Sequence, residues 1–431
     1  MRAHIINNFY SLNRGWALLV LSVTNFLSNK IPGIEFTIES LYPDIDRKVY
    51  RNCKCVKPVK SSFGTLFNAL TRAFVWRVLK AVGFKADALL MWEPLKYFYE
   101  ANVVIDLSGD GLCPAQSKTM WYRIRLTVST FTNLMSIILA LLLEKPVVLY
   151  SHSIGNLGIL RPLVKMVLKN GNVKLIALRD RDSENYLREM GITGSKIRLI
   201  ADAAFSITPP EINTQNDAPT ACFCISNEAV THFYGYSTES FIQILRDISD
   251  YLVNTYSARI LLVPFSRGGR YKHEDDLAIL SAVLDAIRST IGDEKVSLVE
   301  GSNLHEAMSA IAKCKFLVTS RMHPAIVALL YGVPPVLIAH SPKFHGLISF
   351  LKTEELLCDA KHLNYDSLKA KIEYVWENNQ ALRTKIREHT KTLQMLSLSG
   401  LQRLALLLSQ IHARNVSSKS QYKRPKNEFE L

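Results

Sequence analysis

The chain has 431 residues, 48% of them hydrophobic, and a formal net charge of +14 from 52 basic and 38 acidic residues. A chain of this length is too long for one ordinary hydrophobic core, and its apolar content is too high for a chain without a packed interior. We therefore expect a globular protein with two domains. The seven cysteines form no regular framework and include C-x-C pairs rather than the C-x-x-C of zinc ribbons, so nothing demands disulfides and a reducing cytoplasm fits.

The positive charge favours anionic partners, namely phosphorylated substrates, acidic glycans, a membrane surface or nucleic acid. It clusters in Arg47–Lys60, in Arg72–Lys85 and from Arg414 to Lys426. Each cluster is either a solvated face, the simpler interpretation, or a site of peripheral contact with the inner face of a membrane. Because no nucleic-acid motif occurs in the chain, we expect no nucleic-acid partner.

In chain order, the first half predicts alternating strands and helices. The predicted strands are 5–6, 35–41, 101–107, 147–150 and 173–178, and the predicted helices are 16–27, 61–81 and 182–190. The uncharged run Leu126–Leu143 is near the minimum length for a membrane span. Polar residues dilute its first half and a strand follows at once, so we expect a buried helix there. The polar segment 7–15 argues against a secretory signal.

The second half repeats this rhythm after a proline-rich stretch. The predicted strands are 221–225, 260–263, 296–298, 316–319 and 336–339, and the predicted helices are 238–256, 306–314 and 325–331. We therefore expect domains at 1–205 and 221–365, joined by a linker at 206–220. Helices at 366–416 and a disordered basic tail at 417–431 should follow, and the leucine-rich run 395–411 could pack back across both domains.

Charged side chains follow two strands of the second half. Arg321 and His323 come after the strand 316–319, and Lys343 comes after the strand 336–339, in a predicted loop. Ligands of open α/β sheets gather at the carboxyl ends of strands, so these three residues should share one crevice. A guanidinium, an imidazole and an ammonium suit an anionic ligand that needs a proton. Each residue taken alone has a structural interpretation of equal or greater weight.

Loops after other strands add candidate binding residues. The loop 7–15 contains Gly15 and leads into the predicted helix 16–27, an arrangement that can bind an anion. In the turn 108–111, glycines let backbone N–H groups approach a ligand closely. Arg179 either binds an anion or pairs with Asp180 or Asp202, and Arg267 and Arg270 bracket two glycines. The candidates for substrate binding are Asn13, Gly15, Gly109, Asp110, Ser153, Arg179 and Arg267.

These residues resemble the pattern of the polysaccharide pyruvyl transferases. The resemblance is carried by Thr319, Arg321, His323, Gly332, Val333, Pro334 and Lys343, and further by Asn13 and Gly15, by Gly109 and Asp110, by Ser153, Ile154 and Gly155, and by Arg179, Asp180, Ser183 and Asp202. The chain departs from the family's pattern at Trp16, His152 and Asn156. Trp16 either packs in the core, the favoured interpretation, or stacks on a sugar ring.

The resemblance implies an α/β fold with two Rossmann-like domains, whose parallel sheets face a cleft as in GT-B glycosyltransferases. It implies phosphoenolpyruvate as the donor for the second domain and a saccharide acceptor, free or lipid-linked, for the first, in exopolysaccharide biosynthesis for the cell envelope. Arg321 would bind the carboxylate or phosphate and Lys343 would be a second clamp. His323 would be the general acid, because an unperturbed histidine pKa lies near neutral pH. No metal or other cofactor is expected.

Two other functions remain open. A GT-B glycosyltransferase that uses a nucleotide sugar would have the same fold and could use the same cations on a diphosphate. A basic protein that binds glycan or nucleic acid without turnover would bind in a salt-sensitive way and would not need His323.

Overall fold

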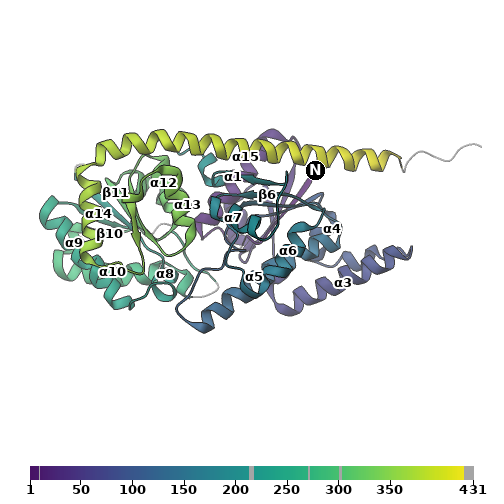
Figure 1. Ribbon diagram of the computed structural model, residues 1–431, viewed down its shortest axis with the longest axis horizontal. Coiled ribbons are helices and arrows are strands. Elements are labelled where there is room, and N and C mark those ends of the chain that lie inside the picture. The colour runs from purple at the N-terminus through teal and green to yellow at the C-terminus, as the bar shows by residue number, and fades with distance from the viewer. Residues whose placement is uncertain (9, 213–217, 270–271, 300–302, 422–431) are drawn as a thin grey trace, which may run out of the picture.

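The computed structural model describes residues 1–8, 10–212, 218–269, 272–299 and 303–421. Two parallel β-sheets lie side by side in it, each covered by helices on both faces (Figure 1). The predicted α/β class with two Rossmann-like halves is therefore confirmed. The predicted linker 206–220 includes 213–217, which lie outside the described residues.

The first sheet has seven strands in the order β3-β2-β1-β4-β5-β6-β7. Its strands are β1 (Arg2–Ile6), β2 (Glu35–Glu39), β3 (Cys53–Val56), β4 (Val103–Asp106), β5 (Val147–His152), β6 (Val173–Leu178) and β7 (Ile197–Leu199). All neighbours are parallel, and the strand order changes direction between β1 and β4. The central strand β4 is buried along its whole length, as its run Val103–Ile105 predicts, and the burial includes Asp106 at its end.

The second sheet has six parallel strands in the order β10-β9-β8-β11-β12-β13. Its strands are β8 (Thr220–Cys224), β9 (Arg259–Leu262), β10 (Val296–Leu298), β11 (Phe316–Thr319), β12 (Pro335–Ala339) and β13 (Leu357–Asp359). The direction changes between β8 and β11, so both sheets repeat the dinucleotide-fold order. Cys222 and Cys224 are buried thiols on β8, as predicted.

Helices cover each sheet by burying one stripe of apolar residues. Around the first sheet these are α1 (Arg14–Lys30), α2 (Pro43–Val49), α3 (Phe63–Ala81), α4 (Leu95–Glu100), α5 (Met120–Leu142), α6 (Arg161–Lys169) and α7 (Arg181–Glu189). Around the second sheet they are α8 (Asn227–His232), α9 (Thr238–Tyr256), α10 (Leu277–Ile291), α11 (Leu304–Ala312), α12 (Met322–Leu330), α13 (Pro342–Leu351) and α14 (Tyr365–Glu377). Helix α1 packs on one face of the first sheet, and α3, α5, α6 and α7 share a core on the other.

The long helix α15 (Asn379–Gln421) crosses both halves (Figure 1). Leu382 and Ile386 join the core of the second sheet, and Leu401 and Leu408 join the core around α1. This agrees with the leucine-rich pattern. Residues 417–421 continue the helix, whereas disorder was predicted from Ser417. The helix sequence Asn379–Gln421 contains no proline that would end it earlier. Residues 422–431 lie outside the described residues.

Two local predictions near the cleft were wrong in detail. Helix α12 begins at Met322 rather than at Pro324, so His323 lies in its first turn. Lys343 is not in a loop but in the first turn of α13, which starts at Pro342, a residue suited to that position. Strands β3, β7 and β13 were not predicted, because each is short and includes a charged residue, namely Lys54, Arg198 and Asp359.

The uncharged run forms most of α5. This is the one helix among the described residues that is long and apolar enough to cross a membrane by length and composition, and 39% of its most hydropathic window is buried. Its second half packs into the core through Leu134, Ile137 and Leu139, as predicted. Its first half remains largely exposed.

Candidate active site

A cleft of about 1210 Å³ lies between the two sheets, at the carboxyl ends of their strands. Its walls are the loops after β1, β4, β5 and β6 on one side and those after β8, β9, β11 and β12 on the other. It therefore spans both positions at which the strand order changes direction, where open α/β sheets bind ligands. Nine predicted site residues line it: Asn13, Gly15, Gly109, Asp110, Ser153, Arg179, Arg321, His323 and Lys343.

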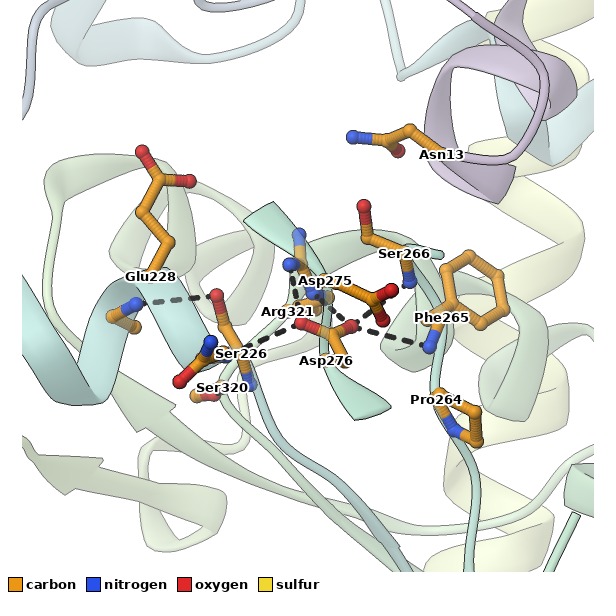
Figure 2. Close-up of polar contacts among 12 residues, drawn as sticks. Asn13, Ser226, Glu228, Pro264, Phe265, Ser266, Asp275, Asp276, Ser320 and Arg321 are labelled. Carbon is orange, nitrogen blue, oxygen red and sulfur yellow. Dashed lines mark hydrogen bonds and ion pairs between the residues drawn. The ribbon is translucent and has the colours of Figure 1, made fainter. Parts of the chain in front are cut away.

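Asn13 joins the two halves at the floor of the cleft. Its side chain caps α1 by accepting from the backbone N–H groups of Gly15 and Trp16. Its backbone pairs in an antiparallel bridge with Ser266, which follows β9, and Figure 2 shows the two residues facing each other. These cap bonds and this bridge hold Asn13 at the floor of the cleft, where a ligand would lie. Trp16 beside it is half-buried and lines the cleft.

Arg267 is not among the residues that line the cleft, and its role in substrate binding stays a prediction. Its backbone N–H donates to the Leu12 carbonyl at 3.0 Å, so 264–267 runs against the loop that precedes α1. The Arg267 guanidinium lies 3.6 Å from Asp275. Arg270 lies outside the described residues.

Arg321 is held by a buried carboxylate. Its Nε and Nη2 atoms donate to the two Asp276 oxygens at 2.7 and 2.5 Å (Figure 2). The Asp276 carboxylate also accepts from the backbone N–H groups of Phe265 and Ser266. Burial alone would lower the pKa of Arg321, but the Asp276 charge and hydrogen bonds raise it. Arg321 is therefore a cation held in a fixed position, and Asp276 occupies the Nε and Nη2 side of its guanidinium.

His323 faces the cleft from the first turn of α12, with its Nε2 atom 4.0 Å from the Asp202 carboxylate. Its side chain is 17% exposed. Burial, opposed by Asp202 and reinforced by Arg179 and Lys343, lowers the pKa of His323 to about 4. The imidazole is thus neutral at pH 7. The sequence alone predicts an unperturbed pKa near neutral pH for His323, and burial in the cleft lowers it.

Lys343 spans the cleft to reach the first sheet. Its Nζ atom donates to Asp110 Oδ2 at 2.8 Å, so the residues predicted as an anion clamp and as a tight-turn aspartate form an ion pair. Burial would raise the pKa of Asp110, but the charges of Lys343 and Arg179 outweigh it and lower that pKa. Gly109, at a positive φ of 68°, turns the chain here and lies close to the Arg179 guanidinium.

Arg179 connects three loops of the first sheet. It donates to Ser153 Oγ and to Asp202 Oδ2, both at 2.9 Å, and Ser153 in turn donates to Asp180, the N-cap of α7. Arg179 thus pairs with Asp202, as the structural interpretation predicted. Its charge still contributes to the cleft that it lines.

Helices α12 and α13 begin at the cleft without side-chain caps. Neither Arg321 nor Ser341, their N-cap residues, bonds a first-turn N–H group. The buried Ser341 hydroxyl has no hydrogen-bond partner among the residues that the structure describes. The positive ends of two helix dipoles therefore lie beside His323 and Lys343. They favour an anion with several oxygens.

A buried polar cluster beneath this space was missed from the sequence. Lys60 donates to the side chains of Asn7 and Asn133, and Asn7 donates to Asp106 at 2.8 Å. Burial, opposed by Glu39 and Asp106, lowers the pKa of Lys60 to about 8. The basic cluster Arg47–Lys60 had been interpreted as a solvated face, but Lys60 follows the unpredicted strand β3 and lines the cleft.

Metal chemistry has no clear site in this cleft. No group of three or more His, Cys, Asp or Glu side chains among the described residues is arranged to hold a metal ion. The expectation that the protein needs no cofactor stays a prediction.

Comparison with known proteins places this geometry in a family. The sequence model of the polysaccharide pyruvyl transferase family matches residues 13–342. The amylovoran biosynthesis protein AmsJ of Erwinia amylovora is 22% identical over 261 residues, which are 57% of this chain and 62% of AmsJ. The match thus spans less than two thirds of the length of this relative.

Solved structures share the fold over nearly the whole chain. MnaA of S. aureus with UDP has a TM-score of 0.58 at 11% identity and covers 95% of this chain and 96% of its own. UDP-GlcNAc 2-epimerase from Neisseria meningitidis, bound to UDP-GlcNAc, has a TM-score of 0.58 at 10% identity and covers 94% and 99%. HepE of Anabaena with UDP and glucose has a TM-score of 0.55 at 12% identity and covers 95% and 100%. At these identities the likeness concerns the fold alone, which is GT-B-like.

The family match begins at Asn13 and ends at Pro342, so it takes in the loops on both walls of the cleft. It includes the residues that hold His323 and the strand ends that carry Arg179 and Arg321. The chain therefore belongs to the polysaccharide pyruvyl transferase family.

Proposed function

We propose that the protein transfers the pyruvate group of phosphoenolpyruvate to two hydroxyls of a saccharide and releases inorganic phosphate. In this reaction the methylene carbon of the donor gains a proton and becomes the methyl group. One sugar hydroxyl adds to the neighbouring carbon, phosphate leaves from that carbon, and a second hydroxyl closes the ketal ring. The two hydroxyl protons balance the one taken up by carbon and the one carried away with phosphate.

The observation that carries the proposal is the meeting of two uncapped helix starts with His323 and Lys343 in one cleft. Phosphoenolpyruvate has a carboxylate and a phosphate, and the positive dipole ends of α12 and α13 would favour binding of both anionic groups. Lys343 lies in the first turn of α13 and would leave Asp110 to bind an oxygen of phosphoenolpyruvate. Arg321 lies beside them as a fixed charge, and we assign it to positioning the α12 start rather than to direct exchange.

His323 is the proposed general acid. It is neutral in the unliganded cleft because burial lowers its pKa to about 4. A bound donor with several negative charges would add opposite charge next to the imidazole and raise that pKa. Protonation would then accompany donor binding, so that the acid is charged only when the methylene carbon that needs the proton is present.

The acceptor is proposed to enter from the first-sheet side. Tyr10 and Trp16 line that wall, and Tyr10 packs edge-on against Trp16 with ring centroids 5.4 Å apart. Aromatic side chains offer rigid apolar area to the faces of sugar rings. The relative AmsJ is named for amylovoran biosynthesis, which supports a saccharide from a polysaccharide pathway as acceptor. The chemistry leaves open whether that saccharide is free or lipid-linked.

The test is phosphate release from phosphoenolpyruvate in the presence of candidate hexose acceptors. We expect turnover with the wild-type protein and a loss of at least about a hundredfold for His323→Ala, within the range for a missing general acid. The fold is also compatible with a nucleotide-sugar glycosyltransferase, so melting is compared with phosphoenolpyruvate and with UDP-sugars. Stabilisation by UDP-sugars and not by phosphoenolpyruvate would overturn the proposal.

A further inference from the structure

Large apolar side chains are exposed along one flank of the first sheet. Phe67 and Phe74 on α3 are 68% and 59% exposed, and Trp121 on α5 is 84% exposed. Soluble surfaces seldom gather such residues into one area without a binding role. The other exposed apolar residues on α3, on α5 and around α6 are Phe63, Val75, Val78, Met120, Ile124, Val128, Ile159 and Met166.

The exposed residues follow the helical period, so they form continuous stripes. On α3, Phe67, Phe74 and Val78 repeat at intervals of seven and four, while Leu66 and Trp76 face the core. On α5, Trp121, Ile124 and Val128 repeat at intervals of three and four. Helices α3 and α5 pack against each other, so the two stripes lie on neighbouring helices. Each helix thus has a second apolar face, which its core packing does not use.

The charge on this flank is mainly positive, although Glu144, which follows α5, pairs with Arg77 and Lys80 of α3. The sequences of α3, α5 and α6 contain arginines and lysines but no aspartate or glutamate. Apolar stripes on helices whose own charged residues are all Lys or Arg match the boundary between anionic headgroups and acyl chains. A protein partner would need its own acidic rim, whereas an anionic membrane supplies both the apolar layer and the negative charge.

The stripes begin at the mouth of the cleft. Phe63 and Val128 are exposed and also line the cleft. In Figure 1, α3 and α5 lie along the lower side of the first half, opposite α15. A bilayer against this flank would therefore adjoin the first-sheet opening. Helix α5 would lie in the interface and not span it, because its second half is part of the core and β5 follows directly.

We propose that the flank formed by α3, α5 and the start of α6 docks on a membrane that contains anionic phospholipid. Docking places the cleft beside the lipid surface, where a lipid-linked saccharide would present its sugar. Only this last step, the lipid-linked acceptor, rests on the proposed function. The docking surface itself stands on exposure, spacing and charge.

Vesicle co-sedimentation tests the docking without any turnover. Full-length protein is mixed with phosphatidylcholine vesicles, with or without phosphatidylglycerol, at low and high salt. We expect binding that requires phosphatidylglycerol and weakens with salt. The triple variant Phe67→Ser/Phe74→Ser/Trp121→Ser should lower the partition coefficient at least about tenfold, because it removes three aromatic anchors.

The matched control is Met395→Ser/Leu406→Ser. These two side chains are 63% and 58% exposed on α15, on the opposite side of the molecule, and the control should bind vesicles like wild type. Wild-type protein that fails to bind anionic vesicles, or a control that loses binding as strongly as the triple variant, would overturn the proposal. So would light scattering that shows a dimer which the triple variant converts to monomer, since a second copy would then cover the flank. Phosphate release on a soluble acceptor should be unchanged in the triple variant, which separates this test from that of the reaction.

Discussion

Gly15 lies so close to His323 that a methyl group on its Cα would be 2.4 Å from the imidazole Nδ1 atom. The contact joins the first turn of α1, in one half of the molecule, to the first turn of α12 in the other. The absence of a side chain at position 15 thus sets where the proposed proton donor lies. The glycine was found from the sequence as part of an anion cradle, but its partner was not.

Gly15→Ala should therefore displace His323 and lower kcat by about a hundredfold, the effect of a misplacement of about 1 Å at a reacting group. Phosphate release under saturating phosphoenolpyruvate measures this. Gly64→Ala is the matched control, because Gly64 lies in the first turn of α3 and an added methyl there meets only Ser62 Oγ, at 3.9 Å. Normal kcat in Gly15→Ala would contradict the placement of His323 at the reacting atoms.

Donor binding should take up a proton at pH 6. The pKa of His323 is lowered to about 4 by burial in the unliganded protein, so the imidazole is neutral at that pH. An anionic donor raises the pKa of His323, and the change in its protonation appears as proton uptake on donor binding, larger at pH 6 than at pH 8.

Calorimetric titration with phosphoenolpyruvate in buffers of different ionisation enthalpy measures this uptake. It should vanish in His323→Gln. It should persist in His345→Gln, which alters another histidine that lines the same cleft. Equal uptake in wild type and in His323→Gln would exclude His323 as the group that is charged by the donor.

The sequence predicted the strand ends well and the side-chain partners poorly, for a physical reason. Buried parallel strands are contiguous apolar runs, so β4, β6 and β11 could be found from local pattern alone. The partner of Arg321 is 45 residues away, at Asp276, and only the order of β9, β8 and β11 in the sheet brings the two together. The lowered pKa of His323 likewise results from burial between two halves, which no local pattern encodes.

Asp276→Asn should destabilise the second half by about 3–5 kcal/mol, because it leaves the Arg321 charge without its buried partner. Asp276 is fully buried and accepts two hydrogen bonds from Arg321. Denaturant unfolding gives the change in free energy. Asp293→Asn is the control, since that carboxylate is 83% exposed and lies 2.8 Å from Arg288 Nε, and it should lose about 1 kcal/mol or less. Similar losses in the two variants would mean that the Arg321 pair does not hold the second half together.

The ion pair between Lys343 and Asp110 should compete with the donor. If Lys343 must leave Asp110 to bind a donor oxygen, Asp110→Asn should tighten phosphoenolpyruvate binding by roughly two- to fivefold, the range for a partly exposed pair. Lys343→Met should weaken it by roughly 10- to 100-fold, because a charge-assisted hydrogen bond to the donor is lost.

Calorimetric dissociation constants at constant ionic strength measure both effects. Lys361→Met is the control, since Lys361 also lines the cleft and its removal tests for loss of general positive charge. If Lys343→Met and Lys361→Met weakened binding equally, Lys343 would act through the field of the cleft and not as a ligand of the donor. If Asp110→Asn weakened donor binding, the aspartate would hold Lys343 in its productive position, and the pair would be part of the bound state and not a competitor of it.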